Sequence, residues 1–221
     1  ALISCTGAAE QGYPTAQFNL GLMFAIGLGV AQDYAEAARW YRAAAEQGYD
    51  RAQNNLAWMY ENGRGVAQDH ADAARWYRAA AEQGYNAAQY RLGLMYRTGR
   101  GVAQDYAEAV LWYRAAADQG YVAAQYRLGR MYESGSGVAQ DYAEAARWYR
   151  AAAEQGLAPA QFNLGWMYAN GLGVALEYVE AVRWYRTAAE QGYDAAQHNL
   201  GWMYANGLGV AQDYNEAARW Y

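Results

Sequence analysis

Residues 34–49 read YAEAARWYRAAAEQGY, and this stretch decides the fold because variants of it return along the whole chain. It recurs from Tyr106 and Tyr142, and with more substitutions from His70, Tyr178 and Tyr214. Each copy begins 36 residues after the one before it. A fixed period of this size is typical of stacked repeats, in which each unit contacts only its neighbours, and not of a closed globule.

The register predicts one elongated domain over residues 1–221. Residues 1–12 align with the end of a unit and are interpreted as the remnant of a preceding helix. The repeats that follow are 13–48, 49–84, 85–120, 121–156, 157–192 and 193–221, with the last one incomplete. We expect the chain to be a fragment of a longer array.

The second helix of each unit is the clearer one. Asp33 is the expected N-cap, and Glu36 three residues later completes a capping box. Aspartate or glutamate occupies both positions in every copy, including Glu177 and Glu180. Alanine fills the interior, which favours helix, and Gly48 suits a left-handed C-cap.

Charged side chains of this helix are spaced to pair along one face. Glu36 and Arg39 lie three residues apart, and Arg42 and Glu46 lie four apart. We expect both pairs to form and to keep that face in contact with water.

The first helix is predicted from Pro14 to Ala25, since apolar residues from Ala16 to Met23 fall on one helical face. Gly27 and Gly29 bracket the turn to the second helix. Two helices joined by a short glycine loop form a helical hairpin, which buries its faces only by stacking on the next. The fold class is therefore all-α, built from about six hairpins of 36 residues.

Composition excludes several classes of function. The net charge of −5 argues against general nucleic-acid binding, which needs a basic surface. All 17 basic residues are arginine, so Schiff-base and serine–lysine chemistry are absent. Cys5 is the only cysteine, and His70 and His198 are the only histidines, so no metal site or cofactor is expected.

Two features of the sequence bear on membrane association. No apolar run of about 18 residues exists, so we expect no membrane span. Leu2-Ile3-Ser4-Cys5 resembles the short box before a lipidated bacterial cysteine, but the charged and apolar regions of a signal peptide do not precede it. The expectation is a soluble protein, with the cytoplasm and the periplasm both open.

A longer motif carries a family resemblance. It reads A-x-x-x-L-G-x-M-Y-x-x-G-x-G-V-x-x-D-Y-x-E-A-x-x-W-Y-x-x-A-A-x-Q-G, and one copy comprises Ala88, Leu92-Gly93, Met95-Tyr96, Gly99, Gly101-Val102, Asp105-Tyr106, Glu108-Ala109, Trp112-Tyr113, Ala116-Ala117 and Gln119-Gly120. This motif closely resembles the Sel-one-like repeat, a relative of the tetratricopeptide repeat. The resemblance implies a right-handed α-solenoid that acts as an adaptor or scaffold for other proteins.

Departures from the motif are few. Ala57 replaces its glycine, His70 replaces a tyrosine, and Leu176-Glu177 replaces glutamine and aspartate. Cysteine-rich bacterial relatives are assigned penicillin binding or weak β-lactamase activity, which transfers poorly to a chain without their cysteines. We expect no enzyme, since Ser134 and Ser136, the candidates for a serine nucleophile, have no histidine near them in the sequence.

Positions that share a place in the repeat form a column. Columns that are constant in every copy, such as those of Trp40 and Gln17, are interpreted as packing, with the glutamines satisfying backbone groups between hairpins. A unique site must use columns that vary, and these lie on the first helices, which the resemblance places on a concave face. The candidate partner-binding residues are Trp58, Tyr90, Arg91, Arg97, Tyr126, Arg127, Arg130, Phe162, Trp166, His198 and Trp202.

These residues predict the chemistry of a partner. Arginine and exposed aromatic side chains dominate the energy of protein interfaces. The hypothesis is an extended peptide whose acidic part or C-terminal carboxylate meets the arginines, while its apolar side chains meet the tryptophans. RNA binding through tyrosine–arginine pairs is the alternative, against which the acidic total argues. Trp220 and Tyr221 at the end of the chain predict end-to-end self-association.

Overall fold

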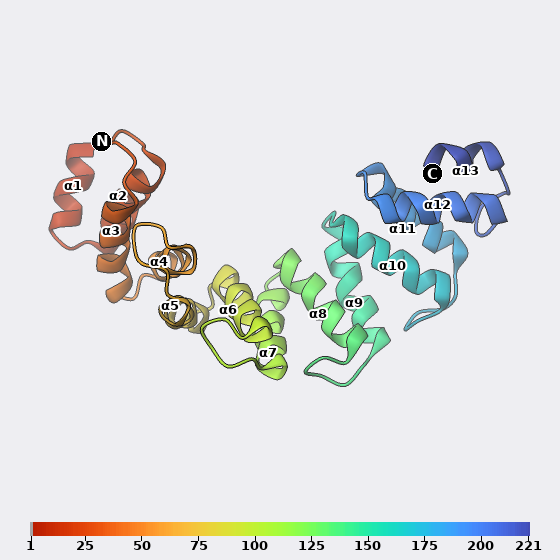
Figure 1. The fold of residues 1–221 in the computed structure, drawn as a ribbon, viewed down its shortest axis with the longest axis horizontal. Helices are drawn as coiled ribbons and strands as arrows, with labels where there is room; N and C mark the ends of the chain where they lie inside the picture. The colour runs from red at the N-terminus through yellow and green to blue at the C-terminus, as the bar shows by residue number, and fades with distance from the viewer. Residues whose placement is uncertain (1) are drawn as a thin grey trace. The chain divides into compact units, whose positions relative to one another are not determined.

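The structure is a computed structural model that describes residues 2–221, with side chains from residue 6 onward. The lipidation hypothesis at Cys5 therefore concerns a side chain outside the described ones. The described part is all-helical and contains thirteen α-helices (Figure 1). They are α1 (Leu2–Glu10), α2 (Pro14–Ile26), α3 (Tyr34–Glu46), α4 (Asp50–Asn62), α5 (His70–Glu82), α6 (Asn86–Thr98), α7 (Tyr106–Asp118), α8 (Val122–Ser134), α9 (Tyr142–Glu154), α10 (Ala158–Asn170), α11 (Tyr178–Glu190), α12 (Asp194–Asn206) and α13 (Tyr214–Trp220).

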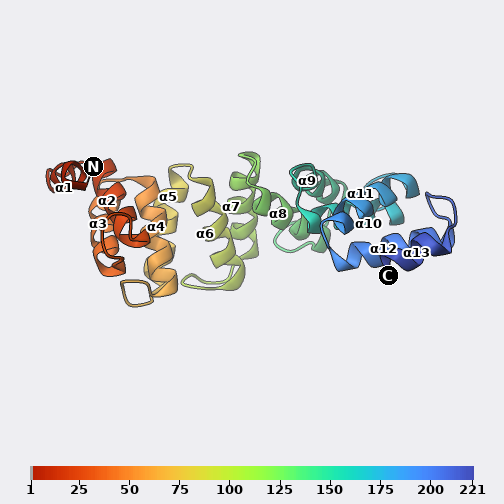
Figure 2. The same cartoon turned by 90° about the horizontal axis from the view of Figure 1, so that it is seen from above.

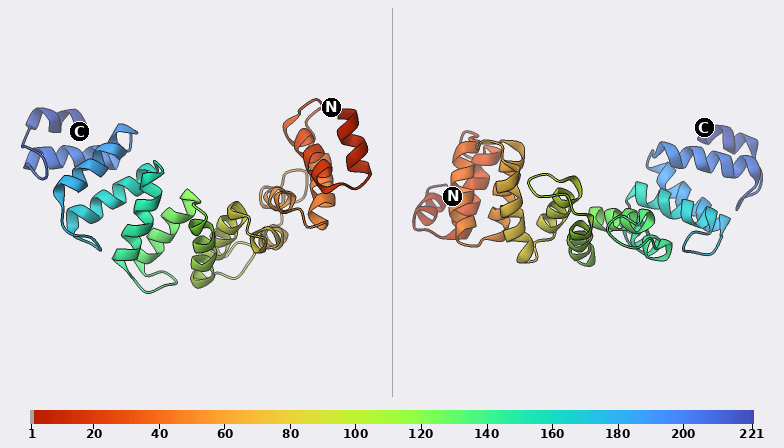
Figure 3. Two further views of the ribbon diagram at one scale, coloured as in Figure 1. Left: turned by 180° about the vertical axis from the view of Figure 1, so that it is seen from behind. Right: turned by 60° about the horizontal axis from the view of Figure 1, so that its bottom comes forward.

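The helices form hairpins, as the repeat predicts. We call the even-numbered helices A-helices and the odd-numbered helices from α3 onward B-helices. An A-helix packs against the B-helix that follows it and against the B-helix that precedes it, as α4 does with α5 and α3 in the first unit and α10 does with α11 and α9 in the second. Figures 2 and 3 show the paired helices side by side in further views. The chain divides into two compact units, residues 1–116 and 117–221, with the boundary inside α7. The predicted all-α fold of stacked hairpins is confirmed.

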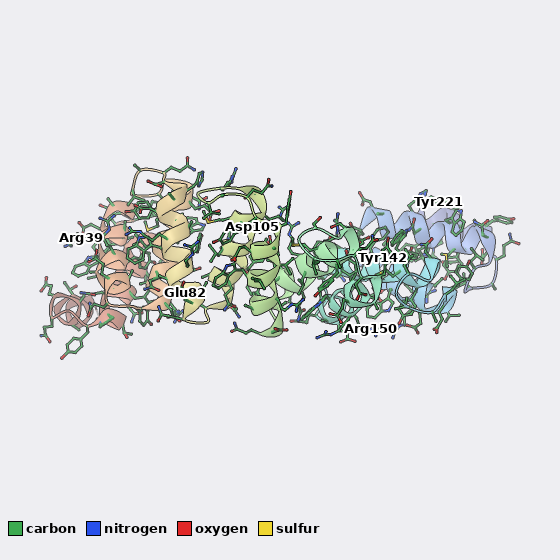
Figure 4. The ribbon with its side chains drawn as sticks, turned by 90° about the horizontal axis from the view of Figure 1, so that it is seen from below. Arg39, Glu82, Asp105, Tyr142, Arg150 and Tyr221 are labelled. Atoms are coloured by element: carbon green, nitrogen blue, oxygen red, sulfur yellow. The ribbon has the colours of Figure 1, made fainter. Side chains whose placement is uncertain are left out.

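Aspartate begins nearly every B-helix. Asp33 Oδ1 accepts hydrogen bonds from the backbone N–H groups of Ala35 at 2.8 Å and Glu36 at 3.1 Å. The same cap is present at Asp69, Asp105 (labelled in Figure 4), Asp141 and Asp213. Glu177 makes no such hydrogen bond, so the predicted cap of α11 is wrong. Its side chain is one methylene longer than aspartate, the residue that suits this position.

Two predictions for the B-helix α3 are also corrected. The capping box is not reciprocal, because the N–H of Asp33 donates to the carbonyl of Phe24 at 3.0 Å and Glu36 pairs with Arg39 at 2.7 Å. The Glu36–Arg39 pair is thus confirmed. The predicted Arg42–Glu46 pair does not form, because Arg42 donates to the hydroxyl of Tyr60 on the next A-helix at 2.5 Å.

Equivalent arginine–tyrosine bonds join further hairpins. Arg78 donates to Tyr96 at 2.5 Å, and Arg186 donates to Tyr204 at 2.7 Å. Arg150, on α9, donates to Tyr168 at 2.6 Å (Figure 4). A charged donor strengthens each bond, so this column fastens a B-helix to the hairpin that follows it.

The core is built from small and large side chains that meet between hairpins. On the B-helix side, alanines such as Ala44 and Ala45 are buried. The next A-helix sets Leu56 and Met59 against them, and both side chains are almost fully buried. Burying a side chain of this size stabilises the fold by roughly 1.5–3 kcal/mol. The first unit repeats this arrangement with Ala80, Ala81, Leu92 and Met95, and the second unit repeats it with Ala188, Ala189, Leu200 and Met203.

Paired glutamines satisfy polar groups inside the junctions, as the sequence predicted. Gln53 donates through Nε2 to the carbonyl of Ala45 at 3.1 Å, and its Oε1 accepts from Gln83 at 2.7 Å. Gln161 and Gln191 repeat the arrangement with the carbonyl of Ala153. Buried polar groups need such partners, so this column has a structural role.

Candidate functional site

The second unit contains two adjoining pockets on its A-helices. The first, which we call the Glu133 pocket, has a volume of about 560 Å³ and is lined by Arg130, Glu133, Ser134, Tyr142, Phe162, Asn163 and Trp166. The second, the Trp202 pocket, has a volume of about 320 Å³ and is lined by Trp166, Ala169, Asn170, Tyr178, Tyr185, Asn199, Trp202 and Met203. The side chain of Trp166 lines both, so the pockets adjoin across α10.

Charged and polar groups of the Glu133 pocket come mainly from α8. The hydroxyl of Tyr149, which is fully buried on α9, donates to Glu133 Oε2. Arg130 Nε lies 3.5 Å from the same oxygen. Burial raises the pKa of Tyr149 well above its ordinary value, and the bond to Glu133 raises it further, so the phenol remains a neutral donor.

Arg130 is held from a second side as well. Its hydrogen bond with Tyr126 is the main reason that the pKa of its guanidinium lies above the ordinary value. The Tyr126 ring in turn packs against Tyr149, with ring centroids 5.8 Å apart. Tyr126 therefore supports the pocket without lining it.

Aromatic side chains from successive hairpins form the remaining walls. Tyr142 begins α9 (Figure 4), and its hydroxyl accepts a hydrogen bond from Gln140 at 3.1 Å. Phe162 is wedged between Tyr185 and Tyr193, with ring centroids 5.7 and 5.4 Å away. These contacts hold the walls in place, so the pocket is formed before any partner arrives.

The Trp202 pocket has no charged side chain in its lining. Trp202 is 48% exposed, while Trp166 is half-buried. Burial raises the pKa of Tyr185 to about 12, and its hydrogen bond with Asn199 acts in the opposite direction. This pocket is suited to an uncharged side chain, with the amides of Asn170 and Asn199 among its polar groups.

Repeated tyrosines explain part of the variation among A-helix columns. The buried hydroxyls of Tyr41 and Tyr185 each interact with an asparagine of the next A-helix, Asn55 and Asn199. Two further tyrosine hydroxyls donate a hydrogen bond to a glutamate of the preceding A-helix: Tyr77 donates to Glu61, and Tyr149, which also interacts with Asn163, donates to Glu133. Buried hydroxyls require partners, so these varying positions have a structural role besides any binding role.

The candidate residues of the first unit lie on α4 and α6. Trp58 is 39% exposed, and the Tyr90 ring packs against Tyr113 with centroids 5.8 Å apart. Arg91 Nη1 lies 3.8 Å from Glu61 Oε2, which offsets part of its charge. Arg97 is half-buried and its Nε has no hydrogen-bond partner among the described residues.

The candidates of the second unit separate into two groups. Arg130, Phe162, Trp166 and Trp202 line the pockets. Arg127 and His198 do not line them. Arg127 is half-buried on α8, and His198 packs against Tyr221 with ring centroids 5.4 Å apart.

Sequence reasoning missed several pocket residues. Tyr142 and Tyr178 are not among the candidate binding residues, because a tyrosine recurs in most copies of their column, and Ser134 is weighed there only as a nucleophile. Its hydroxyl lies 2.8 Å from that of Ser136. The signal available was position: a tyrosine that begins a B-helix lies close to the end of the neighbouring A-helix.

The described residues contain neither a metal-binding cluster nor a helix that could span a membrane. No group of three or more histidine, cysteine, aspartate or glutamate side chains there is arranged to hold a metal ion. None of the helices in residues 2–221 has the length and apolar character needed to cross a bilayer.

Solved structures share this architecture. A protective antigen present in uropathogenic Escherichia coli strains, which displays an SLR fold, is 43% identical over 98% of this chain, with a TM-score of 0.96. The match covers 46% of that protein, so this chain spans about half of its length. A Sel1 repeat protein from Oxalobacter formigenes is 36% identical over 95% of this chain and 84% of its own, with a TM-score of 0.80.

A more distant match shows the fold alone. An immunity protein, Pa5087 from Pseudomonas aeruginosa, is 23% identical over 94% of this chain and 79% of its own, with a TM-score of 0.50. A search of curated proteins found no match.

The family model of the Sel1 repeat matches nearly the whole chain, over residues 14–49, 50–85, 86–121, 122–157, 158–193 and 194–221. The repeats of this family generally serve protein–protein interaction, and its members are typically scaffolds without enzymatic activity. The chain belongs to the Sel1 repeat family.

Proposed function

We propose that this chain is a non-enzymatic scaffold that binds an extended segment of a partner protein across its A-helices, with the two pockets of the second unit as the main contact. The observation that carries the proposal is Trp166, whose indole lines both pockets. Tryptophan and arginine are the side chains that most often dominate interface energy. An extended segment places alternate side chains on one face, which suits pockets that follow one another.

The predicted acidic group of the partner is proposed to contact Arg127. Arg130 lies beside Glu133, so part of its charge is already offset, whereas the described ion pairs do not include Arg127. Arg127, on α8, makes no ion pair among the described residues and is therefore available for a carboxylate of the partner. We expect Arg127→Glu to weaken binding of an acidic partner segment.

The test begins with a ligand selected by the protein itself. Peptides from a random phage-displayed library are selected on the wild-type chain, and the dissociation constants of the synthetic peptides are measured by calorimetry. Trp166→Ala and Trp202→Ala should each weaken binding by about tenfold or more, the usual effect of removing an interface anchor. Circular dichroism establishes that the variants remain folded.

Val179→Ala is the matched control, since Val179 is an exposed apolar residue of the same unit on the B-helix α11. It should leave the affinity unchanged. Failure to select any peptide, or equal affinities for the wild type and both tryptophan variants, would contradict the proposed function.

A further inference from the structure

We propose that the Glu133 pocket receives an arginine side chain of the partner segment. The inference rests on the proposed function and specifies the chemistry of one of its two pockets. This contact with a partner arginine is separate from the contact with a partner carboxylate proposed at Arg127. A partner segment that makes both contacts carries charges of both signs.

The repeats supply an internal control for Glu133. A buried tyrosine hydroxyl in this column needs a partner, and in the hairpin of Tyr185 the asparagine of the next A-helix serves alone, with Ala169 in the place of the glutamate. Tyr149 also has its asparagine, Asn163. The hydroxyl of Tyr149 therefore has a partner even without Glu133, and the presence of the Glu133 carboxylate needs another explanation.

Geometry makes that carboxylate accessible. The Glu133 side chain is 26% exposed and lines the pocket, while its Oε2 atom is fixed by Tyr149. The second oxygen, Oε1, makes no hydrogen bond within the described residues. A carboxylate anchored at one oxygen and accessible at the other can accept a partner's donor with little loss of side-chain entropy.

The walls add an attraction for planar cations. Tyr142, Phe162 and Trp166 line the same pocket as the Glu133 carboxylate. Aromatic faces attract cations, and a guanidinium is preferred to an ammonium because it stacks flat and is less strongly hydrated. A net charge of −5 favours the approach of a cationic group as well.

Arg130 shares the pocket and limits its affinity. Its side chain is 55% exposed and reaches Glu133 at 3.5 Å, which is long for a charge-assisted hydrogen bond. Tyr126 holds its guanidinium from another side. A partner guanidinium therefore competes with a weak, exposed pair, and removal of Arg130 should strengthen its binding.

The first unit contains an equivalent glutamate–tyrosine pair, Glu61 and Tyr77, whose surroundings differ from those of Glu133. Glu61 accepts from Tyr77 at 2.8 Å, but its side chain is only 15% exposed and Arg91 of the next A-helix lies against it. Leu94 occupies the column of Trp166. Glu61→Gln is therefore the control for removal of a tyrosine-bonded glutamate without loss of this pocket.

The experiment uses short blocked peptides as probes. Acetyl-Gly-X-Gly-amide peptides with X as arginine, citrulline or glutamate are titrated into the ¹⁵N-labelled chain, and the indole N–H signal of Trp166, assigned with Trp166→Phe, is followed by NMR. Citrulline has nearly the shape of arginine but no charge. The arginine peptide should shift the Trp166 signal in a saturable way, and the other two should not.

Variants then assign the effect. Glu133→Gln retains an acceptor for Tyr149 and should abolish the shift caused by the arginine peptide, while Glu61→Gln should leave that shift unchanged. Arg130→Gln removes a competing surface charge pair, so it should lower the dissociation constant of the arginine peptide by about threefold or more.

The inference is overturned if the citrulline or glutamate peptide shifts Trp166 equally, if no peptide shifts it at millimolar concentration, or if Arg130→Gln weakens the arginine peptide. Each of these outcomes leaves the proposed function standing as long as library-selected peptides still depend on Trp166. A loss of that dependence would remove the proposed function instead.

Discussion

At the residue scale, Gly101 is required by the close approach of two hairpins. A Cβ atom at this position would lie 1.9 Å from the carbonyl oxygen of His70, and the backbone φ is +69°. Gly84 also has a positive φ, of +90°, but a Cβ there would contact nothing within 4 Å. A substitution at Gly84 therefore introduces backbone strain alone, whereas a substitution at Gly101 introduces both strain and a steric clash.

Gly101→Ala should lower the free energy of unfolding by at least about 3 kcal/mol, because strain and displacement of a neighbouring backbone combine. Gly84→Ala should cost only about 1–2 kcal/mol, the ordinary penalty of a left-handed alanine. Urea unfolding followed by circular dichroism measures both. Equal losses for the two variants would contradict the contact between hairpins.

Tyr185 predicts an alkaline limit of stability. Its pKa is raised to about 12 by burial, against about 10 in an unfolded chain. Between these values the native state keeps a proton that the unfolded state loses, so stability falls as pH rises, by up to about 1.4 kcal/mol per pH unit for one such group. The contribution is fully present below pH 10.

Tyr185→Phe should reduce this slope in urea unfolding experiments at pH 10 to 12. Tyr41, Tyr77 and Tyr149 also have raised pKa values, so a slope should remain. An unchanged slope in the variant would show that the Tyr185 phenol titrates equally in both states.

At the element scale, the cap of α11 is the exception among the B-helices with described caps. Glu177→Asp should create the hydrogen bonds that Asp141 makes to the N–H groups of Ala143 and Glu144, and stabilise the chain by about 0.5–1 kcal/mol. The reverse change, Asp141→Glu, should cost a similar amount. Thermal unfolding of both variants tests this, and a loss of stability on Glu177→Asp would contradict the capping argument.

The helices themselves could be predicted because local residues determine their ends. Predicted from Pro14 to Ala25, α2 ends one residue later at Ile26, where Gly27 adopts a left-handed conformation. The hydrogen-bond partner of Arg42 could not be predicted from local residues. Its partner Tyr60 lies 18 residues ahead in the sequence, and only the stacking of hairpins brings the two together.

The candidate site was predictable only in part, for the same reason. Varying columns indicated Trp166 and Trp202, which line the pockets. They did not indicate Tyr142, because a residue that recurs in most copies is packed in some hairpins and lines a pocket in another. What surrounds a constant residue depends on its neighbours in the adjacent hairpin, and those neighbours vary.

At the scale of the whole molecule, the stacking predicts local responses to damage. Leu164 on α10 is completely buried, so Leu164→Ala should cost about 2–5 kcal/mol. In an array whose units contact only their neighbours, the loss should concentrate nearby. Hydrogen–deuterium exchange should rise most in α9, α10 and α11, and much less in α2, α3 and α4. A uniform rise along the chain would contradict nearest-neighbour stability.

The paired glutamines have a consequence for how such a chain evolves. At these junctions the side-chain amide of an A-helix glutamine pairs with that of the glutamine that caps the following B-helix, as Gln53 pairs with Gln83 beside the carbonyl of Ala45. Duplication or deletion of 36 residues at any point restores this arrangement at the new junction. A change of another length leaves a buried amide and a buried carbonyl unpaired, which costs stability. The gene can therefore lengthen or shorten the array in whole repeats, and selection can then alter the A-helix columns of one copy while its duplicate keeps the original surface.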